Sequence, residues 1–210
     1  MSAEQYFNKI SAIISTIQST QKDKIESAGE LFARSIASGG RVYIFGSGHS
    51  VIPVLDIFPR YGSFVGFYPI YDPRLMWFNI IGPGGPRELL WLERQEGYVR
   101  VVLSSYVLEA RDSMLIFSHG GLNAAPVEMA MEARSKGLPV VSISSLQNYS
   151  QARATHSGGG VSGDQHWFMT ASGTELSLAV AAGLIGYYLV YSIGVRVKIA
   201  RHEQRRAKYR

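Results

Sequence analysis

Residues 41–50 read RVYIFGSGHS and residues 114–123 read MLIFSHGGLN, so a short apolar run is twice followed by a turn rich in glycine and polar side chains. Further runs with the length and composition of buried strands lie at 64–67, 139–144 and 166–171. Helical patterns fall between these runs, at 51–58, 87–105 and 124–136. Strands that alternate with helices predict an α/β protein with a parallel sheet covered by helices on both faces.

The first forty residues carry two apolar stripes at helical spacing, one from Tyr6 to Ile17 and one from Ile25 to Ile36. Gly39 and Gly40 follow them as a helix stop. We expect the two stripes to form an N-terminal helical hairpin over residues 1–40. A chain of 210 residues favours one domain. We place that domain at residues 1–200, followed by a basic tail at 201–210.

Composition and charge exclude several classes of protein. The chain has no cysteine, which excludes disulfides, thiolate nucleophiles and cysteine-ligated metal sites. Its net charge is +5, but residues 196–210 hold seven basic residues and one acidic residue, which leaves the rest of the chain at −1. The body of the protein is therefore not a basic nucleic-acid binder, and we expect no nucleic-acid partner.

Residues 176–195 read LSLAVAAGLIGYYLVYSIGV, an uncharged stretch that basic residues follow. This is the pattern of a membrane span with a cytoplasmic flank, and a membrane-anchored protein is one interpretation. The other is a buried helix of a soluble domain. Tyr187, Tyr188 and Tyr191 lie in the middle of the stretch and not at its ends, which favours the buried helix. The N-terminus has no apolar core of a secretory signal, so we expect a cytoplasmic protein without a membrane partner.

Three predicted strand ends share hydroxyls, amides and glycines. Ligands of open parallel sheets bind outside the carboxyl ends of the strands, where the strand order reverses. Glycine turns, hydroxyls and helix N-termini can bind an oxyanion such as phosphate there. Turns of this composition also occur simply to make the turn and cap a helix. The candidate binding residues are Gly46, Ser47, Gly48, Ser50, Ser118, Gly120, Gly121, Asn123, Ser144 and Ser145. The P-loop and dinucleotide-binding motifs are absent from the sequence.

Four stretches resemble one family: GGRVYIFGSGHS at 39–50, LERQEGY at 92–98, the whole of 112–146, and THSGG at 155–159. The chain resembles the SIS (sugar isomerase) family of phosphosugar-binding proteins, and within it the little-characterised single-domain members. The resemblance covers nearly the whole chain. It implies a flavodoxin-like, three-layer αβα fold with a five-stranded parallel sheet, and a homodimer or tetramer with the site near the interface.

The resemblance also implies roles for the candidate residues. Ser118 and Asn123 would hold the phosphate of a sugar phosphate with the backbone of Gly120 and Gly121. Ser47 and Ser50 would contact phosphate or sugar hydroxyls, and Ser144 or Ser145 would add a further hydroxyl. One position departs from the family pattern, because Gly120 stands where the second serine of the phosphate loop is expected. That departure favours weaker phosphate binding or another ligand.

An aldose–ketose isomerase needs a base, and glutamate and histidine are the usual choices. Glu93 and Glu96 are three residues apart, which predicts a carboxylate pair on one helical face; an exposed helix surface with ordinary ion pairs is the alternative. His49 and His156 match the family pattern in their loops and are the other catalytic candidates. For Glu128 a structural role is favoured.

These residues predict an isomerase or related lyase acting on a phosphorylated sugar or amino sugar. A non-catalytic sugar-phosphate sensor of the same fold is the alternative. No metal site is expected, because HxH and HExxH spacings are missing, and we expect no cofactor.

Overall fold

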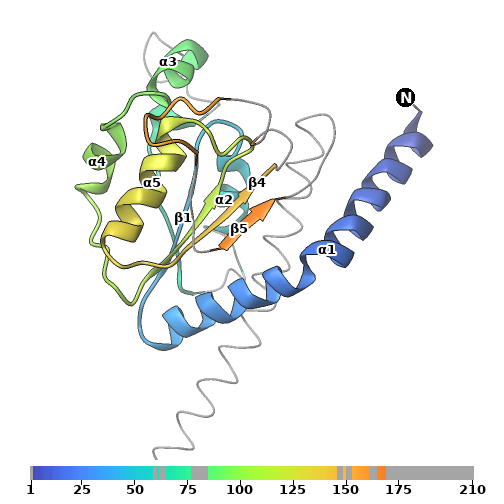
Figure 1. Ribbon diagram of the computed structural model, residues 1–210, viewed down its shortest axis with the longest axis horizontal. Coiled ribbons are helices and arrows are strands. Elements are labelled where there is room, and N and C mark those ends of the chain that lie inside the picture. Colours follow the sequence, from blue (N-terminus) through green and yellow to red (C-terminus); the bar gives the residue numbers. More distant parts are fainter. Residues whose placement is uncertain are drawn as a thin grey trace, which may run out of the picture.

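The computed structural model describes residues 2–58, 61, 65–76, 85–145, 149, 153–160 and 165–168 (Figure 1). The apolar stretch at 176–195 and the basic tail at 201–210 lie outside these residues. What the sequence predicts for them, including the end of the domain at residue 200, stays a prediction. None of the helices in the described ranges has the length and apolar character needed to cross a membrane.

The centre of the fold is a parallel five-stranded sheet with the strand order β2-β1-β3-β4-β5. Its strands are β1 (Val42–Gly46), β2 (Phe67–Pro69), β3 (Ser113–Phe117), β4 (Val140–Ser144) and β5 (Gln165–Phe168). The predicted parallel α/β sheet is thus confirmed, and the weak strand expected at 64–67 lies at 67–69 instead. The strand order reverses between β1 and β3, which makes their carboxyl ends the switch point of the sheet.

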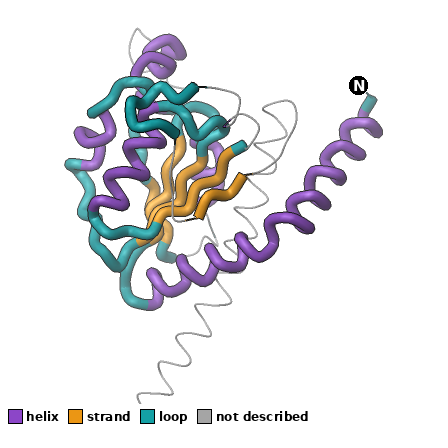
Figure 2. Tube along the Cα trace, viewed as in Figure 1, coloured by secondary structure: helices purple, strands orange, loops and turns teal. Residues whose placement is uncertain are grey.

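Alternating side chains of the strands build two cores. Val42 and Ile44 of β1 pack on one face of the sheet, and Tyr43 and Phe45 pack on the other. The first face is covered by α1 (Ala3–Ala37) and α2 (Val51–Ile57). The second is covered by α3 (Gly85–Leu92), α4 (Tyr98–Leu103) and α5 (Ala124–Ser135). Figure 2 shows helices on both sides of the strands, so the three-layer αβα architecture is confirmed.

The predicted helical hairpin at 1–40 is wrong, because α1 is one uninterrupted helix of 35 residues. No glycine or proline separates its two apolar stripes, so nothing in the sequence ends the helix between them. A capping box at Ser2 and Gln5 starts it. Its buried residues run from Ile17 to Ile36, and Ile13 packs against the same core; Phe7 and Ile14 are exposed, and the N-terminal end extends away from the sheet in Figure 1.

The single helix predicted at 87–105 is divided into α3 and α4 by a turn at residues 93–97. Gly97, which directly precedes α4, has a φ of 87°, a conformation that glycine adopts without strain. The division redirects the chain at Glu93, so that this residue begins a turn and is not part of a helix face. The turn lies close to the carboxyl ends of β1 and β3, as its contacts below establish.

Candidate active site

The loops that follow β1, β3 and β4 lie together at the carboxyl edge of the sheet. Gly46 at the end of β1 is in register with Phe117 at the end of β3. The loop after β3 is tied to β4 and its loop by two backbone hydrogen bonds, from the Ser118 amide to the Ile143 carbonyl and from the Ser145 amide to the His119 carbonyl. The sheet therefore brings together all three polar loops that the sequence predicts as binding loops.

Glu93 lies between the loop after β1 and the N-terminus of α5. Glu93 as a whole residue is only 7% exposed. The Ser47 hydroxyl donates a hydrogen bond of 3.1 Å to its carboxylate, and the Asn123 side chain hydrogen-bonds the same group. Its backbone carbonyl accepts from the Ala125 amide at 2.9 Å. One carboxylate thus joins the two loops of the switch point.

The electrostatics of Glu93 are those of a buried acid. Burial raises the pKa of its carboxyl above the ordinary value of 4.5, because the charged form loses hydration. The hydrogen bonds from Ser47 and Asn123 and the nearby Arg94 and His49 oppose this rise. The carboxyl is therefore a stronger base than an exposed glutamate, while its donors keep it in one orientation.

Glu96 does not share a helical face with Glu93, so the predicted carboxylate pair is wrong. The helix ends at Leu92, and the turn sends the two side chains to different loops. The Glu96 side chain is 44% exposed. It accepts hydrogen bonds from the Ser157 amide at 2.6 Å and the Ser157 hydroxyl at 2.9 Å. The hydrogen bond from the Ser157 backbone amide contributes most to lowering the pKa of Glu96.

His156 is buried beside this second carboxylate. Its Nδ1 accepts a hydrogen bond of 2.8 Å from the Gly158 amide. Its Nε2 lies 3.9 Å from an oxygen of Glu96 and 3.9 Å from one of Glu128. Glu128 accepts from the amides of Gly97 and Val99 at the start of α4, and this is the structural role that its position in the sequence favours.

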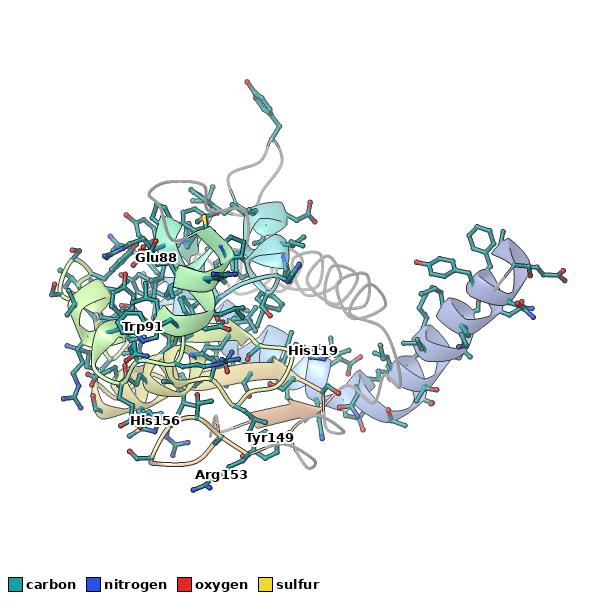
Figure 3. All side chains as sticks on the ribbon, turned by 90° about the horizontal axis from the view of Figure 1, so that it is seen from above. Glu88, Trp91, His119, Tyr149, Arg153 and His156 are labelled. Atoms are coloured by element: carbon teal, nitrogen blue, oxygen red, sulfur yellow. The ribbon has the colours of Figure 1, made fainter. Side chains whose placement is uncertain are left out.

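The three loop histidines have different surroundings, and His49 lies near Glu93. His49 is exposed on the turn after β1. Figure 3 shows His119 and His156 at well-separated places on the molecule. In the described ranges, histidine and carboxylate side chains nowhere form a group of three that could hold a metal ion.

The glycines of the two binding loops have different roles. A Cβ on Gly46 would lie 2.0 Å from the Ser50 carbonyl oxygen, so this glycine is needed for the turn itself. Gly121 has a φ of 64°, and its amide donates to the Ser118 hydroxyl at 3.0 Å. Gly120 has a backbone that other residues adopt, and a Cβ there would meet only Leu122 at 4.0 Å. A side chain could therefore be placed at Gly120 but not at Gly46.

Ser144 presents a buried hydroxyl to this loop. Ser144 is 3% exposed, and within the described part of the chain its Oγ has no hydrogen-bond partner. A Cβ built on Gly121 would lie 3.0 Å from that oxygen, so Ser144 borders the loop directly. A buried hydroxyl without a partner costs about 1–3 kcal/mol, which an oxyanion bound in the loop would offset.

Several residues that sequence reasoning missed also shape the site. Thr155 donates from its amide, at 2.8 Å, and from its hydroxyl, at 3.2 Å, to the Leu122 carbonyl, which holds residues 153–160 against the loop after β3. Gly97 was a sequence signal for the break between α3 and α4, because it ends the turn that begins at Glu93. No local signal marks Ser157 as the partner of Glu96, 61 residues away.

The SIS domain family matches residues 5–145, which is more than half of the chain. The chain is a member of the SIS domain family. Similar curated proteins include a UPF0309 protein of Oceanobacillus iheyensis, 32% identical over 156 residues, and one of Streptomyces coelicolor, 34% identical over 158 residues. The alignments cover 74% and 75% of this chain but 62% and 61% of the relatives, so the chain spans less than two thirds of their length.

Solved structures share the fold of this SIS domain at low identity. Phosphoheptose isomerase GmhA from Neisseria gonorrhoeae aligns with a TM-score of 0.64 and 12% identity, over 91% of this chain and 96% of that one. The Vibrio vulnificus NanR protein complexed with ManNAc-6P aligns with a TM-score of 0.51 and 13% identity, over 99% of this chain and 69% of that one. These likenesses show the fold alone. The cytoplasmic location and the oligomeric state of the SIS domain stay predictions.

Proposed function

We propose that this SIS domain binds a phosphorylated sugar at the carboxyl edge of its sheet and isomerises it, with Glu93 as the base. The observation that carries the proposal is the buried Glu93 carboxylate, which is hydrogen-bonded to Ser47 and Asn123 from the two loops of the switch point. Ligands of open parallel sheets bind at this place. A buried carboxylate with a raised pKa at such a place is typical of a general base.

The phosphate would be bound by the loop after β3. Ser118 and the buried hydroxyl of Ser144 both border Gly121 in this loop; Gly120 directly precedes it, and Ser145 directly follows Ser144. Two predicted phosphate ligands already have other partners, because the Asn123 side chain hydrogen-bonds Glu93 and the Gly121 amide donates to the Ser118 hydroxyl. We therefore assign Asn123 and Ser47 to orienting the base. Ser50 and the glycine turn at Gly46 and Gly48 would line the sugar.

The chemistry needs only one carboxylate. Glu93 would remove the proton from the carbon next to the carbonyl; the electron pair of that C–H bond forms the carbon–carbon double bond of an enediol, and the carbonyl oxygen takes up a proton. Return of the proton to the neighbouring carbon, with loss of a hydroxyl proton, gives the isomeric sugar. Glu93 is ready for this cycle because its raised pKa brings it closer to the working pH.

The first test is a thermal-shift screen of the 210-residue chain against sugar phosphates, with the matching free sugars as controls. A ligand that binds only the folded state raises the melting temperature. We expect a shift with a sugar phosphate that is absent with its free sugar and lost in Ser118→Ala. The absence of any shift at millimolar ligand would overturn the phosphate site.

The second test follows proton transfer by NMR in deuterated water. While the proton is on Glu93 it can exchange with solvent, so an enediol pathway introduces deuterium at carbon or transfers the proton directly and forms the isomeric sugar. A sugar phosphate that binds but neither takes up deuterium at carbon nor converts to its isomer would reject the isomerase and favour the non-catalytic sensor. The structural similarity to NanR, whose structure holds ManNAc-6P, is compatible with that second use of the same site.

A further inference from the structure

A cluster at the carboxyl end of β2 was not predicted from the sequence. Asp72 is buried, accepts a hydrogen bond from the Tyr98 hydroxyl and accepts another from the Arg74 amide at 2.9 Å. The Arg74 guanidinium lies 5.1 Å from the centre of the Tyr98 ring, and its Nε is 3.5 Å from Asp72. The guanidinium is thus held in place by a ring and a carboxylate while its side chain stays 52% exposed.

The cluster adjoins the turn after β1. The Gly48 amide donates a hydrogen bond of 2.7 Å to the carbonyl of Leu75, the residue after Arg74. Gly48 also forms a parallel bridge with Met76. Arg74 therefore lies in the segment that pairs with the turn whose Ser47 hydroxyl contacts Glu93.

A second arginine shows what an ordinary surface ion pair looks like in this molecule. Arg111 has a similar exposure, 54%, and also pairs with an acid two residues earlier in the chain, Glu109. Both its Nε, at 2.7 Å, and its Nη2, at 2.5 Å, face that carboxylate. Arg74 differs, because the atom that faces its carboxylate partner, Asp72, is Nε. Among the described residues, none forms a hydrogen bond with its two Nη atoms.

The strand order sets the distance between the phosphate loop and the end of β2, which Arg74 follows by five residues. β1 lies between β2 and β3, and neighbouring strands are about 4.8 Å apart, so the ends of β2 and β3 are separated by roughly 10 Å. An extended phosphorylated six-carbon sugar spans this separation. With its phosphate on the loop after β3 and its carbons passing Glu93 over β1, its other end reaches the end of β2.

We propose that Arg74 is a specificity-determining residue that binds oxygen acceptors, a carbonyl or carboxylate oxygen, at the end of the sugar remote from the phosphate. The inference rests on the proposed phosphate site. A guanidinium presents parallel donors that suit such oxygens, and one that is already oriented by Asp72 and Tyr98 loses little side-chain freedom on binding. Arg74 thereby selects for the sugar and not for the phosphate.

The test compares Arg74→Ala and Arg74→Lys with the matched control Arg111→Ala. Affinities are measured by titration calorimetry for fructose 6-phosphate, 6-phosphogluconate and inorganic phosphate. Arg74→Ala removes charge-assisted hydrogen bonds. We therefore expect it to lower the affinity for the more tightly bound of the two sugar compounds about tenfold or more. Inorganic phosphate should bind within about twofold of the wild type, and Arg111→Ala should change none of the affinities. Arg74→Lys keeps the charge without the fork and should weaken the sugar compound by a smaller factor.

Equal affinities in Arg74→Ala and wild type would overturn the role of Arg74 while leaving the phosphate site intact. An equal loss for the sugar compound and for inorganic phosphate would mean that Arg74 supports the fold of the edge, which also overturns it. Insensitivity of all three affinities to Ser118→Ala would instead reject the proposed phosphate site. If Arg74→Ala does not fold, Arg74→Lys decides the question by the same ratio of affinities.

Discussion

The two ends of the turn between α3 and α4 carry carboxylates with opposite surroundings. At the inner end, Glu93 is buried against the loops after β1 and β3, and burial raises its pKa. At the outer end, Glu96 is largely exposed, binds Ser157 and has a lowered pKa. Only two residues lie between a group suited to proton transfer and a group suited to holding a loop. Spacing in the sequence does not distinguish them, whereas the path of the chain does.

The largest difference between the two ends is expected in catalysis. Glu93→Gln should slow hydrogen exchange of the bound sugar phosphate by about a hundredfold or more, because the base is lost while its shape is kept. Glu96→Gln should slow it less than about tenfold, since Glu96 acts only through the loop at 155–158. NMR in deuterated water measures both rates. Equal rates for the two variants would remove the functional distinction between the two ends.

Gly120 and Gly121, in the loop after β3 near Glu93, should respond differently to substitution by serine. Gly121→Ser should destabilise the protein by about 1–3 kcal/mol, because the position has a positive φ and its Cβ would press on the Ser144 hydroxyl. Gly120→Ser fits the available space and should tighten phosphate binding about two- to tenfold by adding a hydroxyl. Urea denaturation and phosphate titration provide the measurements. Weaker phosphate binding in a stable Gly120→Ser variant would contradict the placement of the phosphate.

The two carboxylates should have opposite effects on stability as the pH changes. Glu93 has a folded pKa above its unfolded value, so its contribution is favourable below pH 4.5 and is lost as the pH rises through the folded pKa. Glu96 has a folded pKa below its unfolded value, so its contribution is present above pH 4.5 and is lost as the pH falls through the folded pKa. Urea denaturation of the Gln variants at a series of pH values should show the two opposite slopes. Slopes of the same sign would reject the assigned environments.

The smallest effect is expected at the outer end. Ser157→Ala removes one of the two hydrogen bonds to Glu96 and leaves the backbone bond in place. The pKa of Glu96 should rise toward its ordinary value, which an NMR titration of the carboxyl carbon detects. Ligand affinity and hydrogen exchange should stay within about twofold of the wild type. A large loss of ligand affinity or of hydrogen exchange would show that Glu96 and Ser157 take part in binding or catalysis.

Local patterns were sufficient for the elements of the sheet and for the binding loops. Short runs such as 42–45 and 114–117 are apolar throughout, which predicts strands buried on both faces, and the structure confirms them as parts of β1 and β3. Parallel strands place their carboxyl ends at one edge, so Ser47, Ser118 and Ser144 were expected at the same edge, and the strand order makes their strands neighbours. The predicted loops therefore meet, although their roles in binding stay predictions.

Local patterns failed where contacts far apart in the sequence decide the structure. Apolar stripes predicted a hairpin for α1, because periodicity reports which face is apolar and not whether the chain reverses. Helical spacing paired Glu93 with Glu96, because it could not show that the helix ends at Leu92, before both residues. Arg74 was overlooked, since its partner Tyr98 comes from another element.

The sequence alone determined that the chain forms a parallel α/β sheet with polar loops at its carboxyl edge, because each strand and turn is encoded in a few adjacent residues. Only the tertiary structure decided which carboxylate is buried, which arginine is held in place and which buried serine hydroxyls have no partner among the described residues. Burial and pKa depend on neighbours that fold in from distant segments, such as Asn123 for Glu93 and Ser157 for Glu96. No periodicity of the sequence encodes those neighbours, because they are set by the spatial order of the strands and by the loops that pack at their ends.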